Sequence, residues 1–169
     1  HQMKQKKNNS QLLEFLIKER RNMLQYACYR LGCLEDAEDV VQNVFLRLNK
    51  VESGRVEIDV QNPKGYIYRT LANLCSSFLR NESKQNRLPL NDVEDLAEEE
   101  PQNFEQEFNK INRLLSEIPE EQAEVIRLRI YSDLSFQEIA ESVQIPLATA
   151  KSRFLYGITK IRKEISLHE

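Results

Sequence analysis

A strongly acidic stretch divides the chain into two parts. Residues 91–107 contain eight carboxylates and no basic residue, and Pro89 and Pro101 break the stretch. Because like charges repel and few apolar side chains are available to bury, we expect residues 89–107 to form a flexible linker. The 169-residue chain is therefore expected to fold as two small domains rather than around one large core.

Helical periodicity fills the part before the linker. In residues 12–31 apolar side chains recur at steps of three and four, and Gly32 follows as a stop. Residues 34–51 repeat the pattern, with four carboxylates in the first turns, where the helix dipole favours negative charge. Both segments are expected to be amphipathic helices. We expect residues 1–11, which have a polar and basic composition, to be a flexible N-terminus.

A loop and a third, basic helix complete the first domain. Residues 52–62 contain Gly54 and end in an Asn-Pro step, which indicates a loop. The following stretch, "PKGYIYRTLANLCSSFLRNESKQNR", combines a helical apolar stripe with lysines and arginines. The first domain is thus expected to span residues 12–88 and to be entirely helical.

The part after the linker, residues 108–169, has well-marked helix boundaries. Pro119 suits the first turn of a helix. Ser135 and Glu138 match the capping box that begins many helices, and Leu134 and Ile139 occupy the positions of a hydrophobic staple. The sequence therefore predicts a short helix that starts at a defined residue and ends near residues 142–143.

A short capped helix, a tight turn and a basic helix together predict a helix-turn-helix. The second helix lies in "IPLATAKSRFLYGITKIRK", which has five basic residues and no acidic one. Gln144 stands in the turn where such motifs often have glycine. Either this residue has a left-handed backbone at a modest cost, or the turn has another form. Arginine and lysine can bond guanine edges or phosphates. A helical hairpin with a merely solvated basic face is the alternative.

The residue inventory argues against an enzyme and against a metal site. His1 and His168 stand at opposite ends of the chain, and there is no glycine-rich phosphate loop. The odd count of cysteines, Cys28, Cys33 and Cys75, without a C-x-x-C pair favours a reducing cytoplasm over disulfides. No apolar run approaches the ~20 residues of a membrane span. We expect no cofactor, no signal peptide and no membrane insertion.

Four motifs in order resemble one family of bacterial proteins. They are "DAEDVVQNVFLRL", "NPKGYIYRTLANLCSSFLR", the acidic linker and "IPEEQAEVIRLRIYSDLSFQEIAESVQIPLATAKSR". Over about residues 12–165 the chain resembles the extracytoplasmic-function (ECF) group of sigma factors in the sigma-70 family. The resemblance implies an all-α fold of two small domains, the second a helix-turn-helix that is like a winged helix without its wing. It also implies a specificity subunit of RNA polymerase that is not itself an enzyme.

The resemblance assigns the second helix to RNA polymerase binding. The corresponding helix of the family docks on the clamp of core RNA polymerase, and its exposed face here carries Asp39, Gln42, Asn43 and Leu46. A dipole-favourable first turn accounts for the acidic residues equally well. Both readings can hold together.

The third helix resembles the segment that recognises and opens the minus-10 promoter element. Melted bases need aromatic faces and a basic track. The candidates are Tyr66, Tyr68, Arg69, Asn73, Arg80 and Lys84. At least one of the two tyrosines is expected to be core rather than a base-stacking residue. Residues 52–62 correspond to the loop that captures a flipped base in the family.

The C-terminal helix-turn-helix resembles the domain that reads the minus-35 element as duplex DNA. The candidate contacts are Thr149, Lys151, Ser152, Arg153 and Tyr156. Family members commonly have glycine-threonine-valine before the lysine-serine-arginine triplet, whereas this chain has Ala148-Thr149-Ala150. A different base preference with the same docking mode is expected.

The implied partners are core RNA polymerase, promoter DNA as duplex and as melted single strand, and an anti-sigma factor. In the family the linker threads the channels of the polymerase, where carboxylates could imitate nucleic acid. Two alternatives stay open. One is a stand-alone helix-turn-helix regulator that binds duplex DNA as a dimer, and the other is a sigma-like mimic that binds only an anti-sigma factor.

Overall fold

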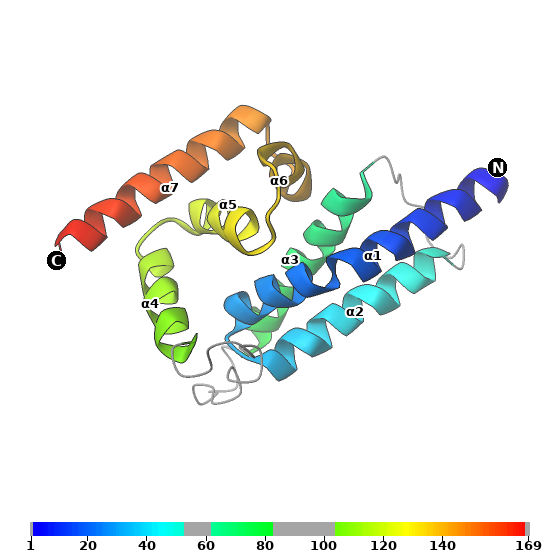
Figure 1. The fold of residues 1–169 in the computed structure, drawn as a ribbon, viewed down its shortest axis with the longest axis horizontal. Helices are drawn as coiled ribbons and strands as arrows, with labels where there is room; N and C mark the ends of the chain where they lie inside the picture. The colour runs from blue at the N-terminus through cyan, green and yellow to red at the C-terminus, as the bar shows by residue number, and fades with distance from the viewer. Residues whose placement is uncertain (1, 53–61, 83–103, 168–169) are drawn as a thin grey trace.

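The computed structural model of the chain describes residues 2–52, 62–82 and 104–167. In these ranges all regular elements are helices, which agrees with the expected all-α fold (Figure 1). The loop at 53–61 and most of the acidic linker lie outside the described residues. The helices are α1 (Gln2–Leu31), α2 (Leu34–Glu52), α3 (Pro63–Glu82), α4 (Phe104–Ser116), α5 (Glu120–Tyr131), α6 (Phe136–Val143) and α7 (Leu147–Leu167).

Helix α1 is longer than the sequence predicts. It begins at Gln2 rather than near Leu12, so the segment expected to be flexible is helical from its second residue. The physical reason is that lysine, glutamine and methionine, which dominate this segment, lose little side-chain freedom in a helix. The stop is as predicted, because Gly32 has a φ of 76° and its N–H donates to the carbonyl of Cys28 at 2.7 Å.

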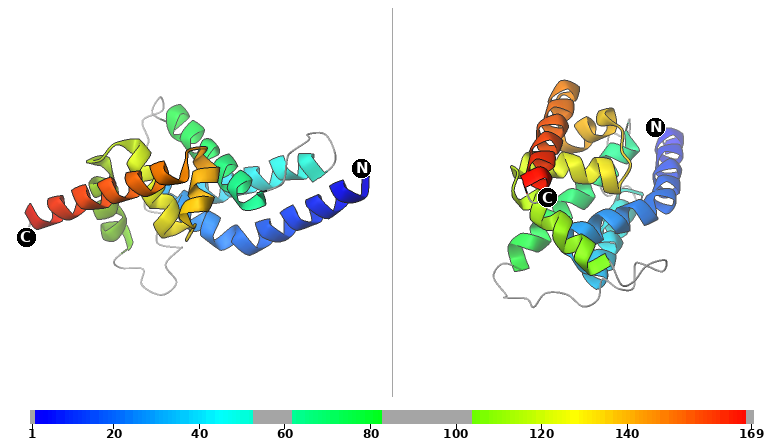
Figure 2. Two further views of the ribbon diagram at one scale, coloured as in Figure 1. Left: turned by 90° about the horizontal axis from the view of Figure 1, so that it is seen from above. Right: turned by 60° about the vertical axis from the view of Figure 1, so that its left-hand side comes forward.

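Helices α1, α2 and α3 form the first helical unit. The first two run antiparallel side by side, and α3 packs against both (Figures 1 and 2). Small residues such as Ala27 and Ala37 are fully buried and allow the helices to approach closely. Val44 and Leu71 fill the space between the helices. All three cysteines are buried and free.

Helices α4 to α7 form the second unit, in which the basic helix α7 packs on α5. Gly157 makes this contact possible, because a Cβ at this position would stand only 2.7 Å from Cδ1 of Ile126. Helix α4 begins at Phe104, four residues before the expected domain start, so the end of the predicted linker is helical. In Figure 1 the C-terminal half of α7 extends away from the first unit.

The predicted helix-turn-helix is present and its local signals are confirmed. Ser135 caps α6, with its hydroxyl accepting from the N–H of Glu138, whose carboxylate in turn accepts from the N–H of Ser135. Leu134 and Ile139 are both fully buried. Helix α6 ends at Val143, and Gln144 has a left-handed backbone, with φ 58° and ψ 52°, which is the first of the two alternatives.

The two units do not have separate cores. Helix α3 packs on α6, and α1 packs on α5 (Figure 1). One cluster of buried residues therefore joins Tyr26 and Leu71 of the first unit with Val125, Leu128 and Ile139 of the second. The sequence indicated two domains joined by a linker and left their relative arrangement open.

Candidate nucleic-acid and polymerase surfaces

The outer face of α7 carries the predicted minus-35 residues. Ala150 and Gly157 are buried, which fixes the rotation of the helix. Lys151 and Ser152 are exposed, Tyr156 is 66% exposed, and Thr149 and Arg153 are half-buried. All five candidates are thus at least partly accessible. Leu155, which the sequence did not single out, adds a side chain that is 63% exposed to the same face.

An aromatic contact holds α7 against α6. The rings of Phe136 and Phe154 meet edge to face, with centroids 5.2 Å apart. The guanidinium of Arg129 lies 4.8 Å from the centre of the Phe136 ring and donates to the carbonyl of Leu134 at 2.8 Å. Sequence reasoning missed Arg129, whose role depends on a residue in the next helix. This arginine supports the motif without facing outward.

Helix α3 presents most of the predicted minus-10 residues. Tyr66 is half-buried with the guanidinium of Arg69 lying 5.4 Å from the centre of its ring, while Asn73 and Arg80 are exposed. Lys84 lies outside the described residues. An aromatic ring, a cation and an amide therefore follow one another along one side of the helix, which is a suitable composition for single-stranded bases.

Tyr68 does not share that surface. It is fully buried, and its hydroxyl donates to Glu19 of α1 at 2.7 Å. Burial, followed by the hydrogen bond and charge of Glu19, raises the pKa of the Tyr68 phenol far above its ordinary value. The sequence left open which tyrosine is core. In this arrangement the ring of Tyr68 is not available to a base, so we leave it out of the candidate surface.

The predicted docking face of α2 is exposed and borders two apolar clefts. Asp39, Gln42 and Asn43 are exposed, and Leu46 is 53% exposed. Gln42 and Phe45 line both clefts. The larger one, of about 460 Å³, also has Ile17 and Leu24 of α1 in its walls. The arrangement offers an apolar groove between two helices with polar groups at its edge, which suits a protein partner.

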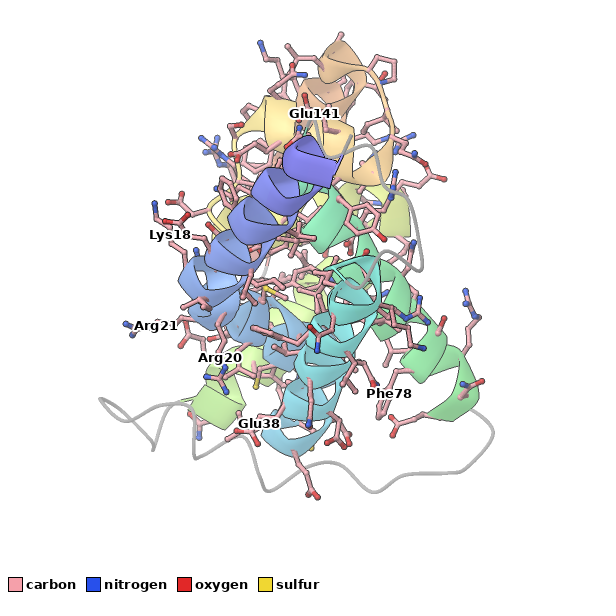
Figure 3. The ribbon with its side chains drawn as sticks, turned by 90° about the vertical axis from the view of Figure 1, so that its right-hand side faces the viewer. Lys18, Arg20, Arg21, Glu38, Phe78 and Glu141 are labelled. Carbon is pink, nitrogen blue, oxygen red and sulfur yellow. The ribbon has the colours of Figure 1, made fainter. Side chains whose placement is uncertain are left out.

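Helix α1 contributes to this groove in a way that the sequence did not indicate. Leu13 is 40% exposed and Ile17 is 67% exposed. Both belong to the stripe of apolar side chains that predicted an amphipathic helix over residues 12–31. This stripe is wider than the face of α1 that is buried against the other helices. Figure 3 shows Lys18 and Arg21 pointing outward from the same helix and Arg20 near Glu38 of α2. The last two line the larger cleft.

A further cleft lies between α3 and parts of the second unit, beside the contact of α3 with α6. Its volume is about 340 Å³, and its walls include Arg69 and Asn73 of α3 as well as Gln144 and Arg153 of the second unit. Two candidate minus-10 residues and one candidate minus-35 residue thus line the same cleft. Nothing in the sequence indicated that they lie near one another.

An ionic network borders this cleft, since Arg30, Glu120 and Glu124 are among the lining residues. Arg127 is buried, and its guanidinium donates to Glu120 at 2.6 Å and to Glu124 at 3.1 Å. Arg30 of α1 reaches Glu120 at 3.1 Å. Burial alone would raise the pKa of Glu120, but the hydrogen bond and charge of Arg127, together with Arg30, hold it below its ordinary value.

Among the described residues, no group of three His, Cys, Asp or Glu side chains is placed to hold a metal ion. Within the same residues, no helix has the length and apolar character needed to cross a membrane. The features that do stand out are basic and aromatic surfaces and apolar grooves. These suit binding of macromolecules rather than a chemical step.

Comparison with known proteins gives a consistent result across the chain. The family described as "Sigma-70 region 2" matches residues 16–85, and "Sigma-70, region 4" matches residues 108–157. The chain is 25% identical to RNA polymerase sigma factor SigV of Bacillus subtilis over 97% of each chain. It is 26% identical to the ECF sigma factor SigW of the same species over 86% of this chain and 84% of SigW. The ECF sigma factor SigE of Mycolicibacterium smegmatis is 25% identical over 90% of this chain and 61% of SigE.

Proposed function

Since the chain belongs to the ECF group of the sigma-70 family, it initiates transcription with RNA polymerase through its two promoter-recognising regions, and we propose which surfaces do this. Proteins of this family are not catalytic. The single observation that carries the assignment is that both regions match in the family order, one on each helical unit. The proposal places the first domain at residues 12–88 and the second at 108–169, which α4 extends back to Phe104.

The groove between α1 and α2 is proposed to bind the clamp of core RNA polymerase. The candidate residues on α2 are exposed, namely Asp39, Gln42, Asn43 and Leu46. Ile17 adds apolar area on α1. Apolar side chains surrounded by polar ones are typical of the centre and rim of a protein interface. The groove therefore favours a docking role for this face over the alternative, in which the acidic residues only form a favourable first helical turn.

Helix α3 is proposed to receive the melted minus-10 strand. Tyr66 supplies a ring for base stacking, Asn73 supplies an amide for a base edge or phosphate, and Arg69 supplies positive charge. Arg80 and Lys84 would extend the basic track toward the end of the helix. No chemical step is needed, because unpaired bases are stabilised by stacking and by backbone contacts as the duplex opens.

Helix α7 is proposed to enter the major groove of the minus-35 element. Lys151 and Arg153 carry the charge, while Thr149 and Ser152 are small polar residues that allow a close approach. Tyr156 lies one turn further along the same exposed face. This division gives the protein two DNA surfaces of different type, one for single strands and one for duplex.

Further parts of the proposal concern location and partners. The protein is proposed to act in the cytoplasm, with the acidic linker running through channels of the polymerase. An anti-sigma factor is proposed as its regulator by analogy with the family. Such a partner would cover polymerase-binding surfaces such as the α1–α2 groove.

Binding to core RNA polymerase separates this proposal from its alternatives. The purified chain should co-elute with core polymerase in size-exclusion chromatography, and the complex should retain DNA that the chain alone releases at the same salt concentration. If the chain does not bind the polymerase and instead binds duplex DNA as a dimer, it is a stand-alone regulator. A chain that binds polymerase but never DNA would be a mimic.

A further inference from the structure

One large apolar side chain stands out on the basic helix α7. Leu155 is 63% exposed, although it lies in the stretch of α7 that has basic residues and no acidic one. Among the described residues, it belongs neither to the two buried clusters nor to the apolar side chains packed against them. Packing in the core therefore does not account for a leucine at this position.

The direction of Leu155 follows from the residues that fix the rotation of α7. Ala150 and Gly157 are buried and mark the inner side of the helix. Residues three and four positions apart share one face of a helix, so Leu155 lies in line with Ser152 and Lys151. Both of these residues are exposed. Leu155 thus shares the face that is proposed to enter the major groove.

A leucine in that groove can make only one kind of favourable contact with a base. Its side chain has no donor or acceptor, whereas the hydroxyl of the neighbouring Tyr156 can bond a phosphate of any sequence. Of the four bases, thymine alone presents a methyl group in the major groove. Against another base, Leu155 would displace water from polar groups without replacing their hydrogen bonds, which is costly. The residue therefore favours thymine both by attraction to its methyl group and by a cost at the other bases.

Helix geometry limits where this thymine can lie. Each residue adds about 1.5 Å along a helix, so Leu155 is about 4.5 to 6 Å further along α7 than Ser152 and Lys151. One base-pair step is about 3.4 Å. If α7 follows the groove, the thymine is within about two base pairs of the bases that Lys151 or Ser152 contacts.

We propose that Leu155 is a specificity-determining residue that packs on the C5 methyl group of a thymine in the minus-35 element. The inference rests on the proposed function, because it requires α7 to read duplex DNA. It adds to the polar candidates on α7 a side chain that acts only through apolar contact. The minus-35 element of this protein should accordingly contain an A·T pair whose thymine methyl group contributes to binding.

Replacement of thymine by deoxyuridine tests this contact, because it removes the methyl group and leaves base pairing unchanged. The chain is assembled with core RNA polymerase, and a promoter found by mapping start sites serves as the duplex. Each thymine of its minus-35 element, on either strand, is replaced in turn, and affinity is measured by filter binding. At one or two positions the affinity of the wild-type holoenzyme should fall about fourfold, which is the effect of exposing one buried methyl group.

Leu155→Ala should remove this discrimination. Alanine preserves the helix, because it has the highest helix propensity, but its side chain ends at Cβ and is too short to reach the methyl group. The variant holoenzyme should bind the thymine and deoxyuridine duplexes with equal affinity at those positions. The matched control is Leu167→Ala, which shortens a leucine that is 74% exposed near the end of the same helix. It should keep the fourfold effect of the wild type.

Several results would overturn the inference while leaving the proposed function intact. They are a wild-type holoenzyme that is indifferent to deoxyuridine at every position, a Leu155→Ala variant with the same loss as the wild type, and a minus-35 element without an A·T pair. Weaker binding of the Leu155→Ala variant to core polymerase without DNA would also overturn it, since Leu155 would then contact a protein. If the wild-type holoenzyme showed no preference for the minus-35 duplex over unrelated DNA, the proposed function would fail and this inference with it.

Discussion

The hydroxyl of Tyr26, near the end of α1, donates a hydrogen bond to the carboxylate of Glu124 in α5, 98 residues further along the chain. The same carboxylate accepts from Arg127 at 3.1 Å. When the units separate, water can solvate both the phenol and the carboxylate, and Arg127 remains beside Glu124 on the same helix. The contact therefore links the two halves of the chain without making their separation prohibitively costly.

Replacing Arg30 with methionine should weaken the contact between α1 and α5. Methionine keeps much of the apolar stem but removes the charge that pairs with Glu120 and Glu124. An ion pair whose carboxylate is 60% exposed contributes about 0.2 to 1 kcal/mol. Conformations in which the two units have separated should therefore become up to about fivefold more populated. Spin labels on α2 and α7, read by double electron–electron resonance, should show longer and broader distances.

Arg21→Met is the matched control, because Arg21 is exposed on the same helix and points outward in Figure 3. Its distance distribution should equal that of the wild type. Identical distributions for the Arg30 and Arg21 variants would show that Arg30 does not hold the units together.

Replacing Lys151 and Arg153 with alanine should weaken DNA binding by the holoenzyme about tenfold or more. Each contact with a phosphate releases counterions from the DNA when the protein binds. Loss of a contact should therefore make the slope of log affinity against log salt shallower by about 1. Filter binding between 50 and 200 mM salt would measure both quantities. Lys163→Ala, on the same helix but outside the motif, should change neither. An unaltered slope in the double variant would remove α7 from the DNA surface.

Replacing Leu46 with aspartate should impair binding to core RNA polymerase. A carboxylate in the centre of an apolar interface is costly to desolvate, so an affinity loss of about 10- to 100-fold is expected, as for other central interface residues. Surface plasmon resonance on immobilised core polymerase would measure it. Leu167→Asp makes the same change at a leucine that is 74% exposed near the C-terminal end of α7 and should have little effect. Equal affinities for the two variants would place the docking face elsewhere.

The contact between Lys64 and Glu138 should make stability sensitive to acid. Burial alone would raise the pKa of Glu138, but the N–H of Ser135 and the ammonium of Lys64 hold it below its ordinary value of 4.5. A lowered folded-state pKa means that the stabilisation is present above the ordinary value and is lost as the pH falls through the lowered one. Urea unfolding from pH 7 to pH 3 would follow this loss.

Glu138→Gln isolates the charge, because glutamine can still accept the hydrogen bond of the capping box. This variant should show a smaller loss of stability between pH 5 and pH 3 than the wild type. Glu141→Gln, which removes an exposed carboxylate of the same helix, should alter the acid dependence less. A steeper acid dependence in the Glu138 variant would contradict the assigned sign.

Local features of this fold could be predicted from the sequence because they depend on residues a few positions apart. The capping box joins Ser135 to Glu138, and the left-handed turn depends on the backbone of Gln144 alone. The exposed face of α7 follows from helical spacing once Ala150 is assigned to the core. These signals located the helix-turn-helix. Of its five candidate contacts, Lys151, Ser152 and Tyr156 are exposed and Thr149 and Arg153 are half-buried.

Contacts between distant residues could not be predicted in this way. Tyr68 is core because Glu19, 49 residues earlier, accepts its hydroxyl, and periodicity alone does not distinguish it from Tyr66. The apolar stripe of α1 does not indicate that Ile17 is left exposed. The acidic linker indicated two domains but not their relative arrangement, which depends on contacts between α1 and α5.

Transcription with purified core RNA polymerase tests the central assignment most directly. The wild-type chain is added to core polymerase on genomic DNA of the source bacterium, and the 5′ ends of the RNA are mapped. We predict a defined set of start sites, each preceded by a shared pair of elements near positions −10 and −35, that is absent with core polymerase alone. Start sites that are scattered without shared elements, or identical with and without the chain, would contradict its assignment as a promoter-specificity factor.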